Sequence, residues 1–312
     1  MNGGEVGSFK GRNIVSLRDM TTDDLWTIVH RAEELKKGIN RQCLSGKTVA
    51  SLFFEPSTRT RLSFESAVLQ SGGQVFGFAD PGASSQRKGE SFADSIRTVT
   101  GYCDAMVIRH PVEGAARLAS EVATVPVINA GDGANQHPTQ TFLDLFTINE
   151  EFGRLDDLTI GIMGDLKYGR TVHSLTHAMA LFRARMVFIS PPSLRMPSAI
   201  LAELDEAGIP YRIAESPEEA AEMEMDILYV TRIQKERFGD PQEYKNIAHS
   251  YRIDRETIDT VGHQVRIMHP LPRVDEIAEE VDSTPNAIYF RQAHNGVPTR
   301  QALLGLVTGG IS

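Results

Sequence analysis

Short apolar runs alternate with segments of helical periodicity along the whole of this chain. In the first half, the runs of strand length are Thr48–Phe54, Gln74–Phe78, Ala105–Arg109 and Val125–Asn129. Between them, the spacing of apolar residues predicts helices near Thr58–Ser71, Ser91–Gly101 and Gly114–Glu121. Strands that alternate with helices are typical of a parallel sheet built from βαβ units.

The second half of the chain shows the same alternation and predicts a second parallel sheet. Its strands are expected at Leu158–Met163, Met186–Ile189, Tyr211–Ala214, Ile227–Val230, Val265–Met268 and Ala287–Phe290. Helices are expected near Thr171–Leu181, Pro197–Ala207 and Pro217–Met223, with a last helix near Thr299–Leu306 that packs on the first half.

Local signals place the first helix and the junction between the halves. Thr21 with Asp24 three residues later forms a capping box, so the first helix begins there. Pro138 suits a first helical turn and Gly153 a helix end, which predicts a helix joining the halves. We therefore expect an α/β protein of two domains, each a parallel sheet flanked by helices: residues 1–139 with 294–312, and residues 140–293.

Composition and charge narrow the class of protein. The 312 residues, 41% apolar and 23% charged, exclude a collagen-like, coiled-coil or wholly disordered chain. With 32 Lys and Arg against 41 Asp and Glu, the net charge is −9, which argues against nucleic-acid and anionic-membrane partners. The chain lacks an apolar run of about eighteen residues and an apolar signal region, so we expect neither a membrane span nor export. Cys43 and Cys103, with no CxxC pair, favour a reducing cytoplasm over a disulfide framework or a zinc site.

The strongest local motif runs from Glu55 to Arg61, after an apolar strand and at the start of a helix. Free N–H groups at a helix N-terminus, three hydroxyls and two guanidinium groups meet there, which suits a phosphate. The alternative is a Ser/Thr helix cap beside two solvated arginines.

Other polar residues follow further strands of the first half. Gly131–Gln140 is a polar loop before a helix, the usual position of ligand sites in α/β sheets, and His137 lies at its exit. A structural hydrogen bond is the alternative role for His137. Arg109 follows a strand as well, with a surface ion pair as its alternative role.

In the second half, Gly161–Thr171 follows a strand but lacks the G-x-G-x-x-G spacing, so a nicotinamide site is disfavoured. His173 and His177 lie four residues apart without the glutamate of H-E-x-x-H, so no metal site is expected. Arginines stand just beyond four predicted strands, which suggests a ligand with several negative charges, such as a phosphate with a dicarboxylate. They are Arg59, Arg109, Arg170 and Arg232.

Polar motifs recur along the chain at the predicted strand ends and loops. They are F-F-E-P-S-T-R-T-R-L-S-F-E at Phe53–Glu65, S-S-Q-R-K-G-E at Ser84–Glu90, R-H-P at Arg109–Pro111, N-Q-H-P-T-Q at Asn135–Gln140, G-D-L-K-Y-G-R-T at Gly164–Thr171, T-R-I-Q-K-E-R at Thr231–Arg237 and H-P-L-P-R-V-D-E at His269–Glu276. Together these motifs resemble the catalytic chains of the aspartate carbamoyltransferase family. They occur in the family's order and cover nearly the whole chain. The resemblance implies the aspartate/ornithine carbamoyltransferase fold, which is Rossmann-like.

The resemblance implies transfer of a carbamoyl group from carbamoyl phosphate to L-aspartate, the committed step of pyrimidine synthesis, without cofactor or metal. It assigns Arg59, Thr60, Lys88, Arg109 and His137 to catalysis. Carbamoyl phosphate would bind to Ser57, Thr58, Arg59, Thr60, Arg109, His137, Gln140, Pro270 and Leu271. Aspartate would bind to Lys88, Arg170, Arg232, Gln234 and Leu271.

The resemblance also implies a homotrimer, because Ser84 and Lys88 lie on a loop, Pro81–Gly89, that reaches the neighbouring subunit's site in this family. Ser85 is the alternative to Ser84. Closure of the two domains is implied too, with an ion pair between Glu55 and Arg237 as its latch. Whether regulatory chains join the trimer stays open.

Three other functions compete with this one. Ornithine carbamoyltransferase shares the S-T-R-T-R motif, but an H-C-L-P motif is expected there in place of His269–Pro272, and Arg232 would repel a cationic side chain. A catalytically silent protein on the same fold is disfavoured because the expected site residues are all present. A nicotinamide dehydrogenase rests only on the glycines at positions 161, 164 and 169.

Overall fold

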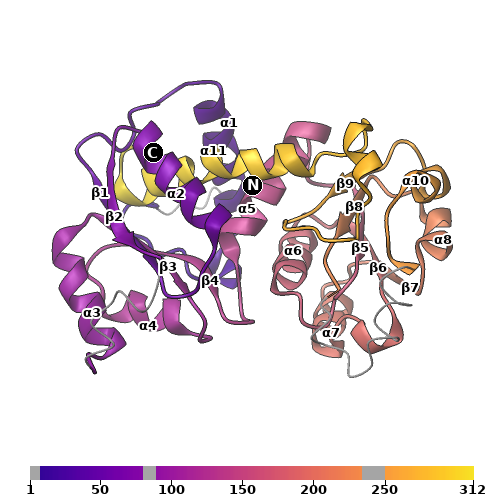
Figure 1. The fold of residues 1–312 in the computed structure, drawn as a ribbon, viewed down its shortest axis with the longest axis horizontal. Coiled ribbons are helices and arrows are strands. Elements are labelled where there is room, and N and C mark those ends of the chain that lie inside the picture. The colour runs from indigo at the N-terminus through magenta and orange to yellow at the C-terminus, as the bar shows by residue number, and fades with distance from the viewer. Residues whose placement is uncertain (1–7, 80–88, 234–249) are drawn as a thin grey trace. The chain divides into compact units, whose positions relative to one another are not determined.

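The computed structural model describes residues 8–79, 89–233 and 250–312. The chain forms two compact units, each an α/β structure with its own parallel sheet (Figure 1). Unit 1 comprises Met1–Phe146 and Asn295–Ser312, and unit 2 comprises Thr147–His294. None of the helices in the described ranges is long and apolar enough to cross a membrane.

Unit 1 contains a parallel sheet of order β2-β1-β3-β4. Ala50 and Leu52 of β1 pack with Ile96 of α3 and Ala119 of α4 in one apolar cluster. Figure 1 shows α2 on the other side of this sheet from α3 and α4. The elements of this unit are α1 (Thr22–Lys36), β1 (Thr48–Phe53), α2 (Thr58–Gln70), β2 (Gln74–Phe78), α3 (Phe92–Val99), β3 (Ala105–His110), α4 (Ala115–Val122) and β4 (Val127–Asp132).

Unit 2 contains a parallel sheet of order β7-β6-β5-β8-β9. One face packs on α8 and α10 through a cluster that includes Val230, Ile258 and Ile267, and α6 lies on the other side (Figure 1). The elements of this unit are β5 (Thr159–Met163), α6 (Arg170–Leu181), β6 (Arg185–Ile189), α7 (Ser198–Glu206), β7 (Tyr211–Ala214), α8 (Pro217–Ala220), β8 (Ile227–Val230), α10 (Arg255–Val261) and β9 (Arg266–Met268).

The chain passes between the units twice, each time within a helix: α5 (Pro138–Phe152) and α11 (Tyr289–Thr308). The first two turns of α5 belong to unit 1, where the Lys36 ammonium lies over the Phe146 ring, 5.6 Å from its centre. The boundaries therefore fall after Phe146 and His294, whereas residues 139 and 293 were expected to end the segments.

Two parts of the sequence-based prediction differ from the structure in unit 2. The strand expected at Ala287–Phe290 is wrong, because Ala287 makes only an isolated bridge with Ile267 and α11 begins at Tyr289. Helix α10 was not predicted, although its signals are present: the Asp254 carboxylate accepts a hydrogen bond from the Thr257 N–H, and Gly262 follows the last residue.

Candidate functional site

The start of α2 lies at the carboxyl end of β1. Ser57 precedes the first helical residue in an extended conformation, and its hydroxyl does not cap the helix. Thr60 is buried and Arg59 is exposed. Because the Ser57 hydroxyl makes no cap hydrogen bond, the first N–H groups of α2 remain available to bind an anion.

Arg109 is held at the end of the neighbouring strand β3, in register with Phe53 of β1. Its guanidinium donates from Nη1 to the Ala130 carbonyl (3.2 Å), and its Nε lies 3.0 Å from the Glu55 carboxylate. Arg109 is therefore a buried, fixed cation and not a surface group. Glu55 pairs with Arg109, and its expected latch partner Arg237 lies outside the described residues.

His137 and Gln140 lie at the start of α5, which follows the loop after β4. Both are buried. The His137 Nδ1 atom lies 3.4 Å from the Thr139 hydroxyl, and the Gln140 amide donates to Asp144 Oδ1 at 2.9 Å. The ends of β1, β3 and β4 therefore carry the unit 1 residues of the predicted site: Ser57, Thr58, Arg59, Thr60, Arg109, His137 and Gln140.

Asp132, which the sequence analysis did not single out, organises the loop before His137. Its buried carboxylate accepts hydrogen bonds from the Gly114 N–H (2.9 Å), the Asn129 amide (2.9 Å), the Asn135 amide (3.0 Å) and the Gln136 N–H (3.3 Å). An aspartate at a strand end before Gly-Ala-Asn is a turn signal that could have identified it.

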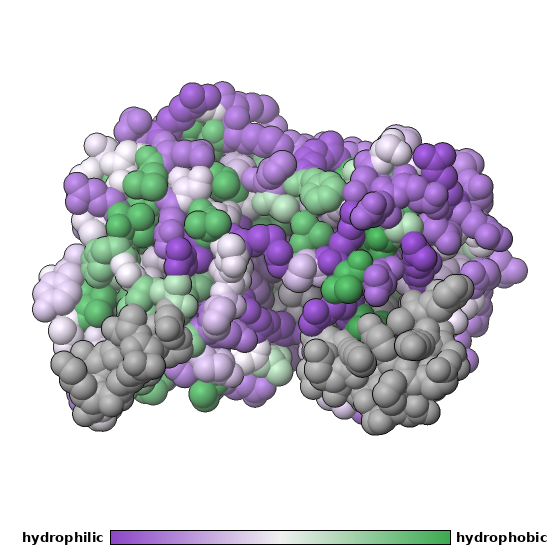
Figure 2. Space-filling view, viewed as in Figure 1, coloured by the Kyte–Doolittle hydropathy of each residue, from purple (hydrophilic) through white to green (hydrophobic). Residues whose placement is uncertain are grey.

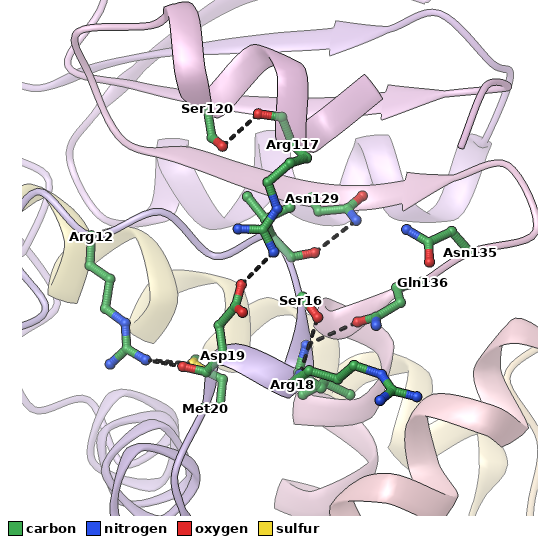
Figure 3. Close-up of polar contacts among 12 residues, drawn as sticks. Arg12, Ser16, Arg18, Asp19, Met20, Arg117, Ser120, Asn129, Asn135 and Gln136 are labelled. Carbon is green, nitrogen blue, oxygen red and sulfur yellow. Dashed lines mark hydrogen bonds and ion pairs between the residues drawn. The ribbon is translucent and has the colours of Figure 1, made fainter. Parts of the chain in front are cut away.

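The N-terminal segment holds the other side of this loop. Ile14 pairs with Ile128 of β4, and the Leu17 N–H donates to the Gln136 side-chain oxygen at 3.0 Å. Figure 3 shows Asn135 and Gln136 in the loop beside Ser16 of this segment. The loop that leads to His137 is therefore fixed by contacts from two distant parts of unit 1.

In unit 2, Arg170 and Arg232 follow the adjacent strands β5 and β8. Arg170 is the first residue of α6, and Arg232 is exposed. The two loops approach closely, because a Cβ atom on Gly164, whose φ is +118°, would lie 2.3 Å from the Thr231 carbonyl oxygen. Glycine at position 164 therefore allows the residues after both strands to lie together at one edge of the sheet.

His269 fixes the backbone that follows β9. Its Nδ1 atom accepts from the Leu271 N–H (2.8 Å), so its Nε2–H donates to the Glu276 carboxylate (2.8 Å). Burial acts to raise the pKa of Glu276, but the hydrogen bonds that its carboxylate accepts from the His269 side chain and the Val274 N–H outweigh burial, and the pKa falls below its ordinary value. Leu271 is held at a φ of +55°, and the Leu271–Pro272 peptide bond is cis.

Pro270 and Leu271 therefore stand at the same edge of the unit 2 sheet as Arg170 and Arg232.

The predicted residues Ser84, Lys88 and Gln234 lie outside the described residues. Among the described residues, no three His, Cys, Asp or Glu side chains are grouped so that they could hold a metal. The His173 Nε2 lies 2.8 Å from the Leu166 carbonyl oxygen and His177 pairs with Glu203.

Two family models match this chain and together span most of it. The carbamoyl-P binding domain of aspartate/ornithine carbamoyltransferase matches residues 12–150, and the Asp/Orn binding domain of the same family matches residues 156–307. The chain belongs to the aspartate/ornithine carbamoyltransferase family.

Within this family, the chain is similar to proteins named for aspartate. The aspartate carbamoyltransferase catalytic subunit of Thermococcus onnurineus (strain NA1) is 54% identical over 306 residues, which are 96% of this chain and 98% of that protein. The same subunit of Methanopyrus kandleri is 54% identical over 309 residues, 98% of this chain and 100% of that protein.

Solved structures of this carbamoyltransferase fold agree. The catalytic subunit of M. jannaschii aspartate transcarbamoylase matches with a TM-score of 0.88 at 49% identity and covers 94% of this chain and 97% of its own. Aspartate transcarbamoylase from Trypanosoma cruzi in complex with carbamoyl phosphate and aspartate matches with a TM-score of 0.87 at 38% identity, covering 96% and 97%.

Proposed function

We propose that this chain transfers the carbamoyl group of carbamoyl phosphate to the α-amino group of L-aspartate, giving N-carbamoyl-L-aspartate and phosphate. The observation that carries the proposal is the identity of 54%, over nearly the whole of both chains, to catalytic subunits named for aspartate. The family models alone admit ornithine, and the relatives favour aspartate.

The start of α2 supplies the phosphate site in this proposal. Ser57, Thr58, Arg59 and Thr60 bind the phosphate group, because free N–H groups, hydroxyls and a guanidinium meet at one helix end. Oxygen atoms of a phosphate accept hydrogen bonds only, which matches a site made of donors.

Attack by the aspartate amine builds negative charge on the carbamoyl oxygen. Arg109, His137 and Thr60 stabilise it as hydrogen-bond donors, and a good donor at this position is worth about 3–4 kcal/mol. Arg109 suits this role because Glu55 and the Ala130 carbonyl already fix its guanidinium. The leaving phosphate is basic enough to take the amine proton, so His137 acts as a donor and no acyl-enzyme forms.

The unit 2 residues bind the amino acid. Arg170, Arg232 and Gln234 hold the two carboxylates of aspartate, together with Lys88 and Leu271. The Gln140 side chain and the backbone of Pro270 and Leu271 accept hydrogen bonds from the carbamoyl NH₂ group. Two guanidinium groups at adjacent strand ends attract a dicarboxylate and repel the side-chain ammonium of ornithine, which is the electrostatic basis for choosing aspartate.

We further propose a homotrimer in which Ser84 and Lys88 complete the neighbouring subunit's site. Support comes from unit 1, where β2 is an edge strand and Leu62, Leu69 and Phe76 of α2 and β2 are exposed by 52%, 62% and 39%. Figure 2 shows apolar residues in green on the left of the view, where Figure 1 draws these elements. Exposed apolar side chains beside an unpaired strand edge favour association with another chain.

The name "catalytic subunit" of the relatives supports association with further, regulatory chains as well. The proposed product is the precursor of a pyrimidine ring, so we place the reaction in pyrimidine synthesis. Cys43 and Cys103 are both free thiols, which supports a cytoplasmic location.

Parallel assays with L-aspartate and L-ornithine test the proposed activity. The full-length protein, carbamoyl phosphate and either amino acid are incubated, and carbamoyl-amino acid and phosphate are both measured. We expect equal amounts of carbamoyl-aspartate and phosphate, and no product from ornithine. Carbamoyl-ornithine as the main product would refute the choice of substrate, and no product from either amino acid would refute the activity.

A further inference from the structure

A fully buried carboxylate lies directly behind Gln140. Asp144 stands one turn further along α5, and its Oδ1 accepts a hydrogen bond of 2.9 Å from the Gln140 side-chain nitrogen. A carboxylate can only accept, so it binds the NH₂ side of the amide. The Gln140 oxygen, on the opposite side of the amide group, is therefore turned away from Asp144.

The charge of Asp144 is balanced by a second buried ion, Arg300 of α11. Arg300 is 3% exposed, lies over the Phe64 ring at 4.9 Å and donates to the Ser63 hydroxyl at 2.9 Å. Burial lowers the pKa of Arg300 to about 10, and the Asp144 carboxylate acts in the opposite direction. Arg300 is therefore still a cation at neutral pH and favours the ionised form of Asp144.

Ser63 and Phe64 belong to α2, the helix whose first turn carries the phosphate residues. Arg300 of α11 therefore contacts α2 directly, and its charge interacts with Asp144 of α5. A buried carboxylate without a cation would be protonated, and a protonated carboxyl could donate to a rotated Gln140 amide. An ionised Asp144 therefore fixes which face of the Gln140 amide the site presents.

We propose that Asp144 is a positioning residue, kept ionised by Arg300, that holds the Gln140 amide with its oxygen toward the carbamoyl NH₂ group. The inference rests on the proposed function. An NH₂ group donates hydrogen bonds, so it binds an amide oxygen and is rejected by an amide nitrogen. The pair thereby makes the site selective for a carbamoyl group over an acyl group of the same shape.

Comparing the binding of carbamoyl phosphate with that of acetyl phosphate distinguishes a change in the Gln140 orientation from a general loss of folding. Acetyl phosphate carries a methyl group where carbamoyl phosphate carries NH₂, so only carbamoyl phosphate depends on the Gln140 oxygen. In Asp144→Asn, residue 144 can donate as well as accept, so the Gln140 amide is free to rotate. We expect the Kd of carbamoyl phosphate, measured by calorimetry, to rise roughly 10-fold, and that of acetyl phosphate to stay within about twofold. Equal weakening of both ligands would overturn the proposal, because a merely structural role affects both.

Two further variants keep the test decisive. If Asp144→Asn does not fold, Asp144→Asn with Arg300→Met removes both buried charges together and should fold, with the same selective loss. In a Gln140→Met background, Asp144→Asn should cause no further selective loss, since no amide remains to be oriented. A selective loss that persists without Gln140 would refute the assignment.

The result of this binding experiment does not depend on whether the protein catalyses carbamoyl transfer. Calorimetry reports binding of both phosphates to the wild-type protein whether or not aspartate is carbamoylated. An inactive wild type would therefore refute the proposed function, whereas a wild type that transfers carbamoyl groups but shows no selective effect of Asp144→Asn would refute the positioning role alone.

Discussion

Arg59 and Arg232 follow strand ends in different units, and single substitutions should separate their roles. Arg59→Ala removes the guanidinium beside the first turn of α2, so we expect the KM for carbamoyl phosphate and the Ki for phosphate to rise about 100-fold. Arg232→Ala should raise the KM for aspartate about 10-fold to 100-fold and leave the Ki for phosphate nearly unchanged. Steady-state kinetics with each substrate varied in turn measures both effects.

Arg41 offers a matched control, because it is an exposed arginine before β1 and thus at the opposite end of that strand from Arg59. Arg41→Ala should change neither KM. Equal losses for both substrates in Arg59→Ala and in Arg232→Ala would contradict the division of labour between the two residues.

Residues such as Asp132 and Asp144 could not be assigned from the sequence. Each of these two residues has a partner that lies far away in the sequence and is brought close only by folding. Asp132 accepts a hydrogen bond from the Gly114 N–H, and Asp144 interacts with Arg300. Arg59 and Arg170, by contrast, each follow an apolar strand and lie in the first turn of a helix. This pattern can be recognised in the sequence within a dozen residues. Local patterns therefore locate the strand-end residues, and tertiary contacts supply what orients them.

The same difference separates elements that were predicted well from those that were not. The capping box of Thr21 and Asp24 is confirmed, with hydrogen bonds in both directions, and β2 spans Gln74–Phe78 as predicted. Helix α11 was expected only near Thr299–Leu306, directly after Pro298. Its 20 residues extend from Tyr289, and the missing N–H of Pro298 is tolerated inside the helix.

Strand β4 was predicted too early in the sequence, because its hydrogen bonds to β3 decide where it begins and ends. Val125–Asn129 is the more apolar stretch, but the strand spans Val127–Asp132. After a change of register, Asp132 still pairs with His110 of β3, so the polar end of the run remains in the sheet. An apolar run therefore predicts that a strand exists, while pairing sets where it ends.

The segment after β9 should be sensitive to acid through Glu276. Its pKa is lowered in the folded protein, so its contribution to stability is complete above its ordinary value of 4.5 and is lost as the pH falls through the lowered value. Glu276→Gln should destabilise the protein by about 1–3 kcal/mol at pH 7, because an amide NH₂ would replace the oxygen that accepts from the Val274 and Asp275 N–H groups. Urea unfolding measures the difference.

The difference in unfolding free energy between wild type and Glu276→Gln should shrink as the pH is lowered below about 4.5. Glu256→Gln, at an exposed position of α10, is the control and should match the wild type at every pH. A difference between wild type and Glu276→Gln that stays constant from pH 7 to the acid limit would show that the carboxylate charge is not what stabilises this segment.

At the scale of the whole molecule, the proposed site needs residues that one folded unit does not supply. Unit 1 carries the phosphate residues and unit 2 carries the arginines for aspartate, while Lys88 is proposed to come from a neighbouring subunit. Sequence alone could predict two units, because each has its own alternation of strands and helices. It could not derive the exchange of Lys88, since nothing in the pattern around residue 88 specifies a neighbour, and only the family resemblance implies it.

Mixed trimers test this exchange of residues. Arg59→Ala and Lys88→Ala subunits, each expected to be nearly inactive alone at a carbamoyl phosphate concentration near the wild-type KM, are dissociated, mixed in equal amounts and reassembled. A site with Arg59 from one subunit and Lys88 from its neighbour arises with a probability of about one quarter, so the mixture should regain roughly one quarter of the wild-type activity. Two subunits that differ by a charged tag allow the mixed trimers to be isolated by ion exchange and assayed separately.

The isolated mixed trimers should each contain one intact site out of the trimer's three, whichever parent is in excess, because a ring of two kinds of subunit has a single junction with the productive order. Both mixed species should therefore show equal activity per trimer. A mixture of Arg59→Ala with Arg109→Ala is the control: both residues lie in unit 1 of the same subunit, so no exchange restores a site. Mixed Arg59→Ala and Lys88→Ala trimers without activity would mean that each subunit uses its own Lys88.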